Sequence, residues 1–174
     1  CNNTNHAVRI KSNNGRGGGV RDILYDGMTG TISQIAIMLK LHYFQRKEKE
    51  EMKEKDLEVT DMTIPKFSNI VIRNIDVQAP FFCWCEGDEF NEITGMHMEN
   101  IKIQQIKPQH KDRKEVPHTK DGHSNYVSNF CLGSWSNIEP EPYPAAYFLK
   151  RFGFNKVMRK DKVEDLKLPD PSTL

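Results

Sequence analysis

Three segments of the chain share one pattern of apolar and polar positions. They are residues 20–30, 67–77 and 93–103. In each segment apolar residues alternate with polar ones, which predicts a strand with one buried face. The alternation then changes phase at Gly27, Asn74 or Asn100 and resumes. A flat strand has no reason to change phase, so we expect the chain to bend at these residues and to continue as a second strand.

The spacing of the three segments indicates stacked coils. They begin at residues 20, 67 and 93, so the first interval is nearly twice the second. A coil of about 25 residues fits this spacing if an additional coil, at the alternating residues 31–37, lies within the first interval. Such coils form a parallel β-solenoid, in which Asn residues at inward bends are expected to form a hydrogen-bonded ladder. Three unrelated strands of an antiparallel sandwich would give the same periodicity.

Two parts of the chain lack this pattern. Residues 45–60 are a run of mixed charge with no apolar face, which is typical of a surface insertion thrown out of one coil. The repeat ends at Pro140, and the prolines that follow break any strand. We therefore expect coils over residues 1–140 and a C-terminal cap or tail over residues 141–174 that covers the edge of the last coil.

Composition narrows the class of protein without identifying its function. Of the 174 residues 37% are hydrophobic and 28% are charged, which fits a folded, soluble domain. A net charge of +1 gives no reason to expect nucleic acid as a partner, and no apolar run is long enough to cross a membrane. The four cysteines are too few to imply a disulfide framework. Because the chain begins at Cys1, we expect a processed product or a part of a longer protein.

The N-terminal region carries the most specific motifs. Arg9-Ile10-Lys11 is followed by a glycine-rich turn at residues 15–19 and a strand from Val20 to Ile23, and an Ile-x-Ile pattern then precedes Tyr43. This order resembles glycoside hydrolase family 28, the polygalacturonases and their relatives that act on pectin. The resemblance implies an all-β fold, a right-handed parallel β-helix, in a secreted protein. It also implies that Arg9, Lys11 and Tyr43 bind the substrate, an acidic polysaccharide of the galacturonan type.

The residues themselves allow this chemistry. Arg9 and Lys11 flank Ile10, so on a strand both cations point to one face while Ile10 enters the core. Two neighbouring cations repel one another unless an anion lies between them, and a galacturonate carboxylate is such an anion. Two ordinary exposed bases on a strand are the alternative. The glycine-rich turn lacks the Lys-Ser/Thr ending of a phosphate-binding loop and suits a tight bend between coils.

The catalytic residues that the resemblance implies are missing. The family hydrolyses its substrate with inversion, using aspartates in Asn-Thr-Asp and Asp-Asp motifs together with a Gly-His-Gly motif, all upstream of Arg-Ile-Lys. None of these motifs is present, and the Asp-Gly-His-Ser run at residues 121–124 lies downstream and is not an equivalent. We therefore expect the chain to need upstream coils, to be inactive alone and to use no cofactor.

Other interpretations are open. A non-catalytic β-solenoid could hold an acidic glycan through Arg9 and Lys11. A metal site could use cysteine and histidine side chains, although their spacing matches no compact zinc motif; these are Cys83, Cys85, His110, His118 and His123. The aromatic residues Phe81, Phe82 and Trp84 fit a buried cluster better than a sugar-stacking edge. His6 lies near the Arg-Ile-Lys strand without an assigned role.

Overall fold

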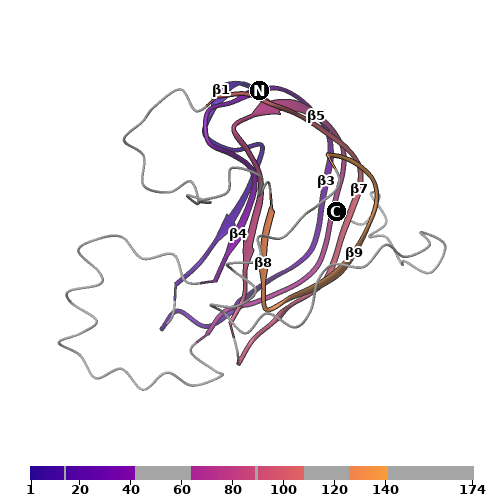
Figure 1. Cartoon of the computed structure of the whole chain (residues 1–174). Coiled ribbons are helices and arrows are strands. Elements are labelled where there is room, and N and C mark those ends of the chain that lie inside the picture. The colour runs from indigo at the N-terminus through magenta and orange to yellow at the C-terminus, as the bar shows by residue number, and fades with distance from the viewer. Residues whose placement is uncertain (14, 42–63, 89, 108–125, 141–174) are drawn as a thin grey trace.

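The structure, a computed structural model, describes residues 1–13, 15–41, 64–88, 90–107 and 126–140. Within these residues it contains nine strands and no helix (Figure 1). The strands are β1 (Asn2–Thr4), β2 (Val8–Lys11), β3 (Gly19–Ile32), β4 (Ile35–Lys40), β5 (Lys66–Ala79), β6 (Phe81–Glu86), β7 (Ile93–Gln105), β8 (Tyr126–Asn129) and β9 (Cys131–Glu139). The predicted insertion at 45–60, the predicted cap at 141–174 and Tyr43 lie outside the described residues.

Every pairing between these strands is parallel. One sheet has the order β1-β3-β5-β7-β9, and the other has the order β2-β4-β6-β8. Strands that follow one another along the chain therefore alternate between the two sheets, which face each other in Figure 1. This arrangement confirms the predicted all-β class and is compatible with a β-solenoid. It does not fit the alternative of an antiparallel sandwich.

The register of the larger sheet confirms the alignment of the three repeated segments. Val20 pairs with Phe67, and Ile70 pairs with Met96. The prediction of an additional coil within the first interval is wrong, because β3 and β5 pair directly with each other. The residues from Ile35 onward instead form β4, which belongs to the second sheet. The first interval is longer because more chain connects β4 to β5, not because a further coil lies within it.

The core lies between the two sheets and consists of columns of apolar side chains. Paired residues of successive strands supply each column, and in one of them the side chains are Tyr25, Ile72, Met98 and Trp135. Leu39 and Cys85 of the second sheet belong to the same buried cluster. Full burial of one Ile or Met side chain contributes roughly 1.5–3 kcal/mol, so these columns supply most of the force that stacks the strands.

The predicted bends are present within the long strands. Gly27, Asn74 and Asn100 have φ values of 76°, 55° and 50°, in the left-handed region that Gly and Asn tolerate best. The Asn74 side-chain amide donates to Asp26 at 2.6 Å, and that of Asn100 donates to Asn74 at 3.3 Å. Asn137, with a φ of 48°, extends the series by donating to Asn100 at 2.6 Å. The predicted asparagine ladder is confirmed, but its side chains lie on the exposed side of the bends instead of pointing inward.

Candidate functional site

Strand β2 places its two cations on the outer face of the smaller sheet. Val8 and Ile10 are buried in the core, Arg9 is half-buried and Lys11 is exposed. The reason is the pairing with β4, which sets Val8 beside Ile37 and Ile10 beside Leu39 and so turns the apolar positions inward. Arg9 and Lys11 therefore share one face, as their spacing predicts. Their role in binding a substrate stays a prediction.

The outer face continues across the neighbouring strands. In register, Lys11 lies beside Lys40 of β4, and Lys40 lies beside Glu86 of β6. We call these three positions the charged row. A parallel row next to it begins at Arg9 and continues through Met38 to Trp84. Neighbouring strands are about 4.8 Å apart, so each row presents one side chain per strand at that spacing.

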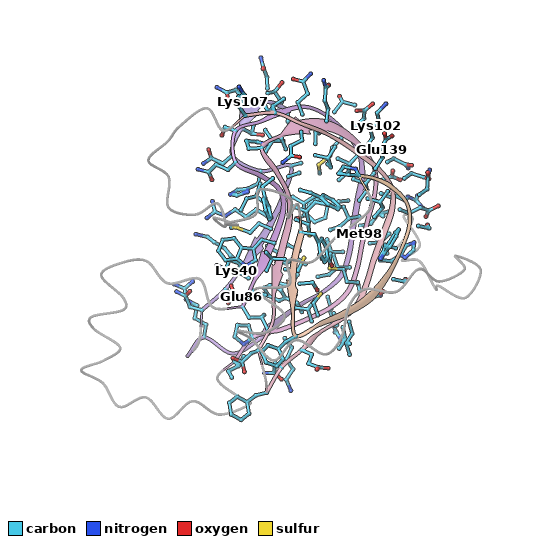
Figure 2. The ribbon with its side chains drawn as sticks, viewed as in Figure 1. Lys40, Glu86, Met98, Lys102, Lys107 and Glu139 are labelled. Carbon is cyan, nitrogen blue, oxygen red and sulfur yellow. The ribbon has the colours of Figure 1, made fainter. Side chains whose placement is uncertain are left out.

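Lys40 is held by two partners on β6. Its Nζ lies 3.1 Å from Oε2 of Glu86 and 3.6 Å from the centroid of the Trp84 ring. Figure 2 shows the Lys40 and Glu86 side chains together on the outer side of the sheet. The side chains are only 15% and 24% exposed, so water screens this ion pair less than a fully exposed one. The cation–π contact with Trp84 further stabilises the ammonium group in this position.

Arg9 and Lys11 lie at the β2 end of this face, and Lys40 and Glu86 form an ion pair across β4 and β6. Arg9 can grip a carboxylate through two parallel hydrogen bonds, and Lys11 can add a further donor.

His6 has a structural position beside this face. Its Nδ1 lies 2.9 Å from the carbonyl oxygen of Ile35. Because a carbonyl oxygen only accepts hydrogen bonds, Nδ1 carries the proton and donates it. His6 therefore ties the chain before β2 to the start of β4.

The candidate metal ligands are not brought together in the described residues. Cys83 and Cys85 are fully buried in the core, and their Sγ atoms are 3.4 Å apart. Contact with the Cys85 thiol and burial both raise the pKa of Cys131, which keeps that thiol protonated. Within the described ranges there is no group of three or more His, Cys, Asp or Glu side chains that could hold a metal ion. His110, His118 and His123 lie outside those ranges.

The three aromatic residues of β6 occupy different surroundings. Phe82 packs in the core, with its ring centroid 6.0 Å from that of Tyr126. Phe81 is also buried, in a smaller cluster with Val127 and Ile35. Trp84 is half-buried and lies under Lys40. The preferred interpretation of packing is confirmed for the two phenylalanines, whereas Trp84 belongs to the outer face.

Sequence reasoning missed Lys40 and Glu86 as members of this face. Both end short apolar strands, and each lies two residues after an outward-facing residue of its strand, Met38 or Trp84. The spacing of two residues from Met38 or Trp84 was the sequence signal that Lys40 and Glu86 face outward. It could not show that the two residues meet, because their pairing depends on the register between β4 and β6.

Comparisons with known proteins do not identify the function of this site. In the part of the chain that the structure describes, no helix has the length and apolar character needed to cross a membrane. No family model, no curated protein and no solved structure matches the chain.

Proposed function

We propose that the chain contributes the carboxylate-binding strand of a secreted glycoside hydrolase that acts on pectin-type polyuronides, resembling glycoside hydrolase family 28. The observation that supports this function is the placement of Arg9 and Lys11 side by side on the outer face of the smaller sheet. Both residues belong to the Arg-Ile-Lys motif on which the resemblance rests. Tyr43, outside the described residues, is proposed to line the same cleft.

The proposed fold is a right-handed parallel β-helix. Successive strands alternate between the two parallel sheets, and this alternation supports a solenoid path for the chain. Connections between parallel strands of one sheet are right-handed in nearly all proteins, which supports this hand for the proposed helix. In such a helix an extended polysaccharide can run across several strands.

The proposed ligand follows from the charge on β2. Side chains two residues apart on a strand are separated by roughly 7 Å, so one carboxylate can contact both Arg9 and Lys11. A uronic acid supplies that carboxylate together with hydroxyl groups that half-buried polar side chains can bind. Each charge-assisted hydrogen bond of this kind contributes about 1.5–3 kcal/mol.

A second candidate function is a non-catalytic β-solenoid that binds an acidic glycan. Inverting hydrolysis needs two carboxyl groups about 6.5–9.5 Å apart. In the charged row formed by the described strands, Glu86 is the single carboxylate, and Lys40 holds it in an ion pair. This observation favours binding without hydrolysis for the described strands themselves; in the first candidate, the catalytic aspartates come from upstream coils.

Titration calorimetry with an unesterified galacturonate oligomer tests the shared part of both candidates. Arg9→Gln and Lys11→Gln are each expected to weaken binding about tenfold, because each removes a charge-assisted hydrogen bond. Lys102→Gln is the matched control, since Lys102 is exposed on the other sheet. Equal affinities for Arg9→Gln and Lys102→Gln would contradict the proposal.

Hydrolysis separates the two candidates. The complete gene product is incubated with the same oligomer, and new reducing ends and their anomeric configuration are followed by NMR. Release of inverted product supports the hydrolase. Binding that depends on Arg9 without any release supports the glycan-binding solenoid.

A further inference from the structure

The core contains a cluster of four sulfur atoms that lies between the two sheets. Cys83 and Cys85 belong to β6 of the smaller sheet, whereas Met96 of β7 and Cys131 of β9 belong to the larger sheet. The Met96 sulfur lies 3.8 Å from Sγ of Cys85 and 3.7 Å from Sγ of Cys131. All four side chains are fully buried. Two thiols from opposite sheets therefore meet at one thioether.

We propose that Cys85 and Cys131 form a disulfide bond when the chain folds under oxidising conditions, and that this bond ties β6 to β9 across the core. The two thiols contact each other, and this contact, together with burial, raises the pKa of Cys131. The bond would close a loop that contains β7 and β8 and so would join the two sheets covalently. The inference does not rest on the proposed function, because it uses no residue of the outer face.

Cys83 is a less suitable partner for Cys85, although their Sγ atoms are 3.4 Å apart. The two residues lie two positions apart on one strand, which separates their Cα atoms by about 6.6 Å and keeps their Cβ atoms at a similar distance. A disulfide needs Cβ atoms about 3.5–4.5 Å apart. Cys131 belongs to another strand, so the spacing along β6 does not restrict its approach to Cys85.

The oxidant in the test is glutathione disulfide. The thiolate of one cysteine attacks it and releases one glutathione, and the thiolate of the second cysteine then attacks the mixed disulfide and releases the other glutathione. The two thiols thus lose two electrons and two protons, and one glutathione disulfide becomes two molecules of glutathione. In the folded chain burial keeps the thiols protonated and away from the oxidant, so the bond forms while the core is still open.

The experiment refolds the full chain from urea in a glutathione redox buffer, or in a reducing agent for comparison. It uses a Cys1→Ser background, because Cys1 is exposed and could link two chains. Remaining thiols are alkylated under denaturing conditions, and tryptic peptides are mapped by mass spectrometry without reduction. Trypsin cuts after Arg73 and Lys102, so the two cysteines of β6 share one peptide and Cys131 lies in another.

The expected product is the β6 peptide linked to the Cys131 peptide. Cys83→Ala is the matched control and should keep this link, whereas Cys85→Ala should lose it. A chain in which all three buried cysteines remain open to alkylation after refolding would overturn the inference. A dominant bond between Cys83 and Cys85 within one peptide would also overturn it.

Stability gives a second readout. The oxidised and reduced forms of each variant are compared with each other, so that the loss of a buried side chain cancels. The oxidised chain is expected to unfold at a urea midpoint about 1 M or more above the reduced chain, because the cross-link restricts the unfolded chain. Cys131→Ala should show no such difference. A linked chain that is no more stable than its reduced form would contradict the proposed tie between the sheets.

Discussion

Replacing Asn74 separates two contributions of the bend residues to stability: their side-chain hydrogen bonds and their tolerance of a left-handed backbone conformation. Asn74 has a left-handed φ of 55°, donates to Asp26 at 2.6 Å and accepts from Asn100 at 3.3 Å. Alanine at this position loses both hydrogen bonds and strains the backbone. Glycine loses the same hydrogen bonds but adopts a left-handed φ without strain. The difference between the two variants therefore measures the backbone contribution alone.

The expected magnitudes follow from these contacts. Two exposed hydrogen bonds at the low end of their usual range contribute about 1 kcal/mol together. The left-handed conformation costs alanine about 1–2 kcal/mol, and glycine costs about 0.5–1 kcal/mol through the entropy of the unfolded chain. We therefore expect Asn74→Ala to lower the free energy of unfolding by about 2–3 kcal/mol and Asn74→Gly by about 1.5–2 kcal/mol.

Urea unfolding followed by the fluorescence of the two tryptophans, Trp84 and Trp135, measures both values. A second readout is the pKa of Asp26. Hydrogen bonds from Arg73, and to a smaller extent from Asn74, hold that pKa below its ordinary value. Removal of the Asn74 donor should raise it, which a carboxyl-carbon NMR titration detects. An alanine variant no less stable than the glycine variant, with an unchanged Asp26 pKa, would refute this account of the bend.

Three further predictions concern the core, the pH dependence and the sheet edges. Ile72→Ala should lower the free energy of unfolding by about 2–5 kcal/mol in urea titration, because Ile72 is fully buried; Asp76→Ala, exposed on the same strand, should change it by less than about 0.5 kcal/mol. Burial lowers the pKa of His97 despite the nearby Glu99 carboxylate, so the unfolded chain binds a proton first and stability should fall as the pH drops through about 6.5. His97→Asn should flatten this slope in unfolding curves measured at several pH values, and an unchanged slope would contradict the assignment. Within the described residues β1 and β9 end the larger sheet, and β2 and β8 end the smaller one. Sedimentation velocity should therefore detect self-association of the isolated chain, whereas a monodisperse monomer would count against open edges.

The larger sheet could be predicted from the sequence because its strands carry their own signal. A phase change at Gly27, Asn74 and Asn100 marks both the bend and the register, and the observed pairing follows that alignment. The same signal is present in β9, where Trp135 and Ile138 flank Ser136 and Asn137. It was missed because Gly133 occupies the position that Ile70 and Met96 hold in the earlier strands, which interrupts the apolar alternation.

The smaller sheet could not be predicted in the same way. In β4, residues 35–39 are all apolar and buried, so the period of two that would mark an inner and an outer face is lost. Ile35 and Met38 pack in a separate cluster from their neighbours Ile37 and Leu39. Apolar surface on both sides of the strand hides its register from any pattern based on hydrophobicity.

The same distinction explains how far the candidate site could be derived. Arg9 and Lys11 share a face because they are two residues apart on one strand, which needs no knowledge of any partner strand. Lys40 and Glu86 face one another only because β4 pairs with β6 in one particular register. Since the connections between successive strands differ in length, that register cannot be read from spacing. The two cations were therefore visible in the sequence, whereas the ion pair between Lys40 and Glu86 emerged only when the strands were assembled.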